Sequence, residues 1–136
     1  MDYYKKDHKR MRLTLVLLLS FLASGLATGM ESYPDTYENV NLDVILNNER
    51  LFNQYMDCVL DKAPCTADGH YLKHILPEAV ATTCEKCNVK QRQMARKIGN
   101  YLKNSKPKTW AAFLEKYDPN KKYIATFEQF LVQIEK

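Results

Sequence analysis

Several sequence patterns that would point to catalysis are absent from this 136-residue chain. It contains no Gly-x-Ser-x-Gly or His-Glu-x-x-His motif and no glycine-rich loop that could hold a phosphate. No segment alternates apolar and polar residues for more than a few positions, so we expect no β-sheet. Asn-x-Ser/Thr sites are missing too, which argues against N-glycosylation. These absences argue against an enzyme and favour an all-α fold.

The first 29 residues carry most of the net positive charge and do not look like part of a folded domain. Five Lys and Arg residues precede an almost wholly apolar run, Leu13–Leu22, and small residues follow it. This order is typical of a secretory signal peptide, which we place at residues 1–29 with cleavage after Gly25 to Gly29. A membrane anchor is the alternative, but a span needs ~20 apolar residues.

The mature chain is nearly balanced in charge. Removing the first 27 residues takes away five of the 20 basic and two of the 16 acidic side chains, which leaves 15 and 14. So small a net charge does not favour binding to nucleic acid or lysis of anionic membranes. We expect residues 30–136 to form a single domain, secreted into extracellular fluid, where cysteines pair by default.

Six consecutive segments show apolar residues at helical spacing, so the predicted fold is an all-α globule of short amphipathic helices. Pro77 lies inside the third segment, where no capping residue would start a new helix, and we expect a kink. Asn88 and Gln91 have the spacing of a capping box. The predicted helices cover Leu42–Leu46, a segment after Asn48, one opening at Thr66 or Asp68, one after Asn88, one from Pro107, and one carrying Tyr123 to Ile134.

The four cysteines follow the pattern Cys58-x6-Cys65-x18-Cys84-x2-Cys87. If most of residues 66–83 are helical, Cys65 and Cys84 are separated by up to ~28 Å. A disulfide needs Cα atoms within ~7 Å, so the spacing favours Cys58–Cys65 and Cys84–Cys87. The same separation argues against one four-cysteine zinc site. A thioredoxin-like redox pair is the lesser alternative, because the βαβ context is absent.

Several longer motifs stand in register with these cysteines, namely Tyr37–Leu46, Arg50–Cys58, Leu76–Ala79, Cys84–Cys87 and Lys116–Pro119. Over about residues 33–123 the chain resembles the insect chemosensory proteins. The resemblance implies six helices around an apolar channel, sequential disulfides and secretion. It also implies reversible binding of long-chain fatty acids, esters and alcohols, with no catalysis and no cofactor.

The resemblance also implies a set of residues that line the channel. Whether their stripes enclose a hollow or a filled core stays open, because every apolar stripe is first of all core. Tyr55 and Tyr101 could offer hydroxyls to a ligand head group or to a backbone carbonyl, and Gln91 serves equally well as a helix cap. The expected lining residues are Tyr37, Leu42, Ile45, Leu46, Tyr55, Leu72, Ile75, Gln91, Ile98, Tyr101 and Trp110.

Other candidate sites have simpler interpretations. His70 and His74 could share a helical face, but no third ligand is evident, so we expect no metal site. The basic cluster Lys90, Arg92, Arg96, Lys97, Lys103 and Lys106 is expected to be a solvated helix face. Contact with anionic lipid or a receptor surface is the alternative. We expect a monomeric carrier of a hydrophobic small molecule, and the competing hypothesis is a secreted interaction or signalling protein with a packed core.

Overall fold

The computed structural model describes residue 29, residues 31–37 and residues 39–134, and the side chain of Tyr37 is outside this description. The chain divides into two compact units, Met1–Met30 and Glu31–Lys136. The predicted signal peptide, residues 1–29, therefore lies outside the described residues apart from Gly29. The helical fold belongs to the second unit.

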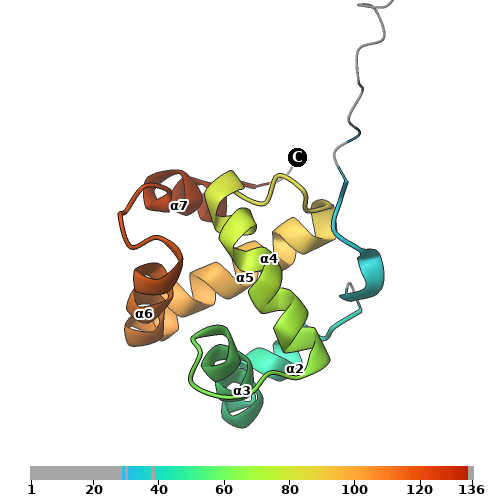
Figure 1. Cartoon of the computed structure of the whole chain (residues 1–136), viewed down its shortest axis with the longest axis vertical. Coiled ribbons are helices and arrows are strands. Elements are labelled where there is room, and N and C mark those ends of the chain that lie inside the picture. The colour runs from blue at the N-terminus through green and yellow to red at the C-terminus, as the bar shows by residue number, and fades with distance from the viewer. Residues whose placement is uncertain (1–28, 30, 38, 135–136) are drawn as a thin grey trace, which may run out of the picture. The chain divides into compact units, whose positions relative to one another are not determined.

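The described part of this second unit contains helices and no strands (Figure 1). Its elements are the 3-10 helix η1 (Asp35–Tyr37) and the α-helices α2 (Leu42–Leu46), α3 (Glu49–Val59), α4 (Ala67–Thr82), α5 (Val89–Ser105), α6 (Pro107–Tyr117) and α7 (Ile124–Val132). The six α-helices match the six predicted segments. The predicted all-α fold class is confirmed.

Polar side chains start four of these helices. Asn41, Asn48 and Thr66 each accept a hydrogen bond from a backbone N–H in the first turn of α2, α3 and α4. Asn88 and Gln91 form the predicted capping box at the start of α5. Because each cap satisfies N–H groups that a helix leaves without partners, the sequence fixes these starts locally.

Pro77 does not divide its helix, since α4 runs without interruption from Ala67 to Thr82. The helix ends where Thr83 and Cys84 both adopt left-handed backbone conformations, with φ of 54° and 65°. Neither residue is glycine, so this tight turn carries some backbone strain. The Cys84–Cys87 disulfide closes the same turn, with 5.1 Å between the Cα atoms.

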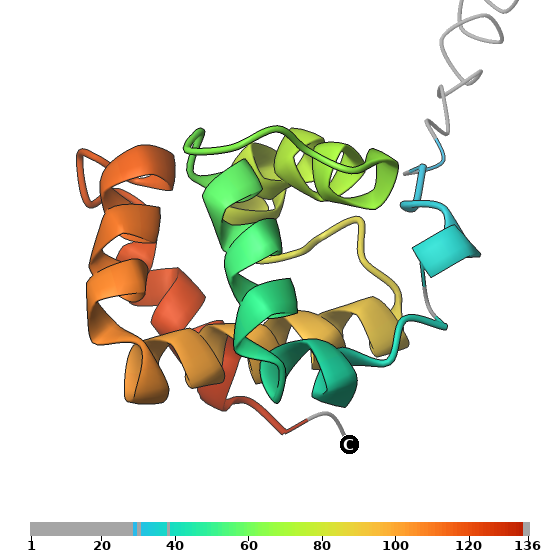
Figure 2. The same ribbon diagram turned by 90° about the horizontal axis from the view of Figure 1, so that it is seen from below.

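The two longest helices, α4 and α5, lie on opposite sides of the unit, and Figure 2 shows α4 above and α5 below. Both α6 and α7 pack on α4 and on α5, while α3 packs on α4 and α2 packs on α3 and α5. The Cys58–Cys65 disulfide joins the end of α3 to the segment before α4. The shorter helices therefore bridge the two long ones and enclose the space between them.

Helix α7 packs closely against α5. Phe127, Phe130 and Leu131 are buried, and a Cβ on Gly99 would lie 2.5 Å from a methyl carbon of Leu131. A side chain at position 99 would therefore force the Leu131 side chain to move, and glycine avoids this. The predicted apolar face does not reach Ile134, whose exposed fraction is 91%, because the helix ends at Val132.

The prediction that the basic cluster of α5 forms a solvated face is wrong for Arg96, which is only 9% exposed. Its Nε donates to the backbone oxygen of Phe130 at 2.9 Å, and the guanidinium lies 4.5 Å from the centroid of that ring. Arg92 is half-buried and donates to the backbone oxygen of Cys84. Both arginines add a second donor to carbonyls near helix ends that also accept from the backbone N–H groups of Gln133 and Cys87, and their long stems tolerate burial.

Candidate ligand-binding cavity

A cavity of about 230 Å³ lies inside the helical unit. One buried water needs roughly 10–15 Å³ on the same kind of measure, so this space is far larger than a packing defect. The sequence left open whether the apolar stripes enclose a hollow or a filled core, and the structure has a hollow. Residues of all six α-helices line it, together with Tyr33, Val40, Cys84 and Cys87.

Most of the residues expected to line a channel do lie in the cavity wall. Tyr101 does not, because its ring packs edge-on against Phe52, with 5.4 Å between the centroids. Tyr37 cannot be placed, since its side chain lies outside the described residues. The expected residues that the structure brings together around the cavity are Leu42, Ile45, Leu46, Tyr55, Leu72, Ile75, Gln91, Ile98 and Trp110.

Sequence reasoning named Trp110 but missed the aromatic and sulfur-containing side chains beside it, Phe113, Phe127, Met56 and Met94. Trp110 stacks on Phe113 with centroids 5.8 Å apart and on Phe127 at 6.4 Å, and all three line the cavity. Met56 and Met94 also contribute. The helical spacing marked these residues as inward-facing, but it contains no signal that separates the wall of a void from packed core.

Few polar groups interrupt this wall. Among the described lining residues they are Tyr33, Tyr55, Asp68, Tyr71 and Gln91. Burial and a hydrogen bond to Glu78 raise the pKa of Tyr33 to about 12. Burial and the nearby Asp68 carboxylate also raise the pKa of Tyr55. Both phenols therefore stay protonated and uncharged at neutral pH.

The segment that leads into η1 is hydrogen-bonded across one edge of the cavity. Tyr33 donates its backbone N–H to the oxygen of Lys86 at 3.0 Å, and its hydroxyl donates to Glu78 Oε2 at 3.1 Å. Gln91 Nε2 donates to the backbone oxygen of Pro34 at 3.0 Å, while its Oε1 accepts from the N–H of Asn88. Both polar ends of the Gln91 amide are thus occupied within the chain, which favours the helix-cap interpretation.

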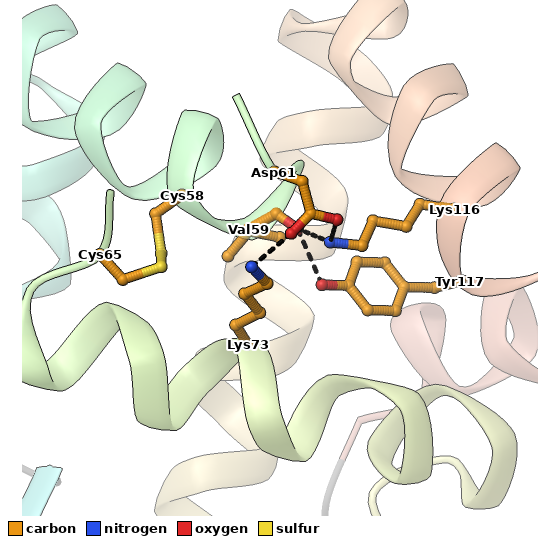
Figure 3. A network of polar contacts seen from close by, with 7 residues as sticks. All are labelled: Cys58, Val59, Asp61, Cys65, Lys73, Lys116 and Tyr117. Atoms are coloured by element: carbon orange, nitrogen blue, oxygen red, sulfur yellow. Dashed lines mark hydrogen bonds and ion pairs between the residues drawn. A yellow bond between two sulfur atoms is a disulfide. The ribbon is translucent and has the colours of Figure 1, made fainter. Parts of the chain in front are cut away.

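A polar network fixes the opposite side of the wall, where α3 ends (Figure 3). The backbone oxygen of Val59, whose side chain lines the cavity, accepts from Lys116 Nζ at 2.6 Å and from the Tyr117 hydroxyl at 2.9 Å. Asp61 pairs with both Lys73 and Lys116, and these lysines lower the pKa of its carboxyl. Side chains from α4 and α6 therefore hold the end of α3 in place.

Other kinds of site find little support in the described residues. They contain no group of three or more His, Cys, Asp or Glu side chains that could hold a metal ion. Within the same part of the chain, no helix is both long and apolar enough to cross a membrane. All four cysteines are paired in disulfides.

The fold and the cavity define the class as a small all-α protein, disulfide-linked at two turns, that encloses an apolar space. Residues 33–125 match the pattern of the family described as "Insect pheromone-binding family, A10/OS-D". The chain belongs to this family, and the resemblance to insect chemosensory proteins is confirmed.

Individual relatives support this assignment. Ejaculatory bulb-specific protein 3 of Drosophila melanogaster is 38% identical over 118 residues, which cover 87% of this chain and 90% of the relative. A solved chemosensory protein in complex with bromo-dodecanol has a TM-score of 0.67 at 34% identity and covers 72% of this chain and 98% of its own. The antennal chemosensory protein A6 from the moth Mamestra brassicae has a TM-score of 0.61 at 31% identity, with coverage of 76% and 100%.

Proposed function

We propose that this protein is a secreted, monomeric carrier that reversibly binds long-chain hydrophobic molecules in its internal cavity. The observation that carries the proposal is the void itself, about 230 Å³ with an almost wholly apolar wall. Burying a methylene group is worth about 0.8 kcal/mol, so a tail of ten to fifteen carbons offers roughly 8–12 kcal/mol before the loss of ligand freedom. Micromolar affinity is the expected net result, which permits both loading and release.

The described part of the wall is suited to binding a hydrophobic tail. Trp110, Phe113 and Phe127 form a stacked aromatic face, and aliphatic side chains of α4 and α5 form much of the remainder. A related chemosensory protein has been solved in complex with bromo-dodecanol, a twelve-carbon alcohol. The N-terminal segment predicted to be a signal peptide supports export into an extracellular fluid.

The single tryptophan of the chain provides a direct test, because Trp110 lines the cavity. Bromine quenches indole fluorescence on close approach, so titration with bromo-dodecanol should quench Trp110 and saturate at micromolar concentrations. Bromo-ethanol has the same bromine and hydroxyl groups without a long tail, so its quenching should be weak and should not saturate. Equal quenching by the two alcohols would contradict a tail-binding cavity.

The competing hypothesis is a secreted interaction or signalling protein with a packed core. Such a protein has no need of a void of this size, and the cavity therefore argues against it. Native mass spectrometry of the purified protein with added dodecanol separates the two, since a carrier retains dodecanol as a one-to-one adduct. A packed core predicts an adduct-free spectrum at every dodecanol concentration.

A further inference from the structure

The described cavity wall carries charge of one sign, which is negative. Among the described lining residues Asp68 is the one charged side chain, and no Lys, Arg or His contributes to the wall. Several basic residues on α5 or directly after it are engaged elsewhere: Arg96 and Arg92 donate to backbone carbonyls, and Lys106, which follows α5, pairs with Glu49. A ligand anion inside the cavity would therefore find no cation in the described wall.

Uncharged hydrogen-bonding groups, in contrast, are present in the wall. Tyr33, Tyr55 and Tyr71 all contribute to it. Since the Tyr33 hydroxyl donates its proton to Glu78, its oxygen keeps lone pairs that can accept a hydrogen bond from a ligand. An alcohol can donate to such an oxygen, and phenol hydroxyls in general can donate to the oxygen of an alcohol or an ester.

An ionised carboxylate has no good position in this arrangement. Deep in the cavity it would lose its water without gaining a cation, which is among the costliest burials in proteins. Near solvent it would meet Asp68, a residue that is exposed and also lines the cavity, so that like charges would repel. A hydroxyl or ester head group loses far less on leaving water.

We propose that the cavity selects long-chain ligands with uncharged head groups, such as alcohols and esters, and rejects the ionised acids of equal chain length, with Asp68 as a specificity-determining residue. This inference rests on the proposed carrier function. It assigns the ligand class within that function, because the tail supplies affinity to all three kinds of molecule and the head group alone distinguishes them.

The test compares three ligands with the same bromine-tagged twelve-carbon tail, the alcohol, the methyl ester and the free acid. Their quenching of Trp110 is measured at pH 7.5, where the acid is ionised, and below the concentration at which each forms micelles. We expect the alcohol and ester to bind similarly and the carboxylate to bind at least ~10-fold more weakly. Equal affinity for all three would overturn the inference while leaving the carrier function intact, and no binding by any would contradict the carrier function itself.

The role of Asp68 is tested with Asp68→Asn, which keeps the size of the side chain and removes its charge. The variant should reduce the ratio between alcohol and carboxylate affinity by at least ~3-fold, chiefly by improving carboxylate binding. Glu115→Gln is the matched control, because Glu115 is exposed on α6 outside the cavity wall and the variant changes net charge equally. An unchanged ratio in Asp68→Asn, or an equal change in both variants, would overturn the assignment of specificity to Asp68.

Discussion

The end of the molecule built around α7 and the side built from α2 and α3 are held together in different ways. At the α7 end, polar side chains bond to the backbone: Arg96 and Asn100 donate to the oxygens of Phe130 and Leu131, both at 2.9 Å. The buried carboxylate of Asp118 accepts from the backbone N–H groups of Lys122, Tyr123 and Ile124 at 2.7 to 3.0 Å. These bonds are short and partly or fully buried, and each joins a side chain to a backbone group.

The α2 and α3 side relies instead on ion pairs with exposed partners. Asp43 of α2 pairs with Lys97 at 2.5 Å, and Glu49 of α3 pairs with Lys106, with the acidic side chains 68% and 71% exposed. Ion pairs of this kind contribute about 0–1 kcal/mol each. The comparison indicates that the polar bonds at the α7 end stabilise the fold more than the ion pairs of α2 and α3 do, while α3 is held by its buried side chains and its disulfide.

The largest expected effect is the loss of the buried carboxylate at the α7 end. Asp118 is only 4% exposed and caps the loop into α7 with three hydrogen bonds, so Asp118→Ala should lower the free energy of unfolding by about 4 kcal/mol. Urea unfolding with the disulfides intact measures this loss. Asp118→Asn keeps one acceptor oxygen and should lose about half as much. A loss below about 1 kcal/mol for the alanine variant would contradict the stabilising role of this end.

A pair of identical substitutions compares the α7 end with the part of the cavity wall formed by α4. Leu131 is 3% exposed against Gly99, so Leu131→Ala should cost about 3 kcal/mol. Leu72 is half-buried in the cavity wall, where part of its surface faces empty space, and Leu72→Ala should cost about 1 kcal/mol. Equal losses in urea unfolding would mean that the cavity wall is packed as tightly as the α7 end.

Filling the cavity should affect binding and not folding. Ala95→Phe places a ring at a position of the α5 wall, and we expect bromo-dodecanol to bind at least ~10-fold more weakly, a change of about 1.4 kcal/mol. Stability should change by less than about 1 kcal/mol, because the ring enters empty space. Ala111→Phe, at an exposed position of α6, is the control that should bind normally. Unchanged affinity in Ala95→Phe would show that the ligand lies elsewhere.

The smallest effect concerns alkaline pH and the network at the end of α3. Burial and the nearby Asp61 carboxylate raise the pKa of Tyr117 from 10 to about 12. Between these values the unfolded chain releases a proton that the folded chain keeps, so this residue makes stability fall as pH rises. Tyr117→Phe should therefore weaken the decline of Tm between pH 10 and pH 12. An unchanged slope would contradict the burial of this hydroxyl.

The features that could be predicted from the sequence are those set by short-range signals. The caps Asn48, Thr66 and Asn88 act within three residues of their own position, and each starts a helix as predicted. The cysteine pairing followed from the length of the helix between Cys65 and Cys84, and the structure has that pairing.

The features that could not be predicted from the sequence depend on contacts with residues far along the chain. Arg96 was expected at the surface because its acceptor, the oxygen of Phe130, lies 34 residues away. Tyr101 has the helical phase of its neighbours Ile98 and Leu102, yet it contacts Phe52 of α3 while the other two line the cavity. Helical spacing predicts which face is inward, but the distance between α4 and α5 decides whether that face meets a void.

The most direct measurement is a crystal structure of the protein with bromo-dodecanol, with the bromine located by its anomalous scattering. The account predicts one bromine and its attached chain enclosed between α4 and α5, against the rings of Trp110 and Phe127 or towards Tyr55 and Asp68, depending on the direction of the tail. Bromine found solely on the outer surface, with side chains filling the space between the two long helices, would contradict it.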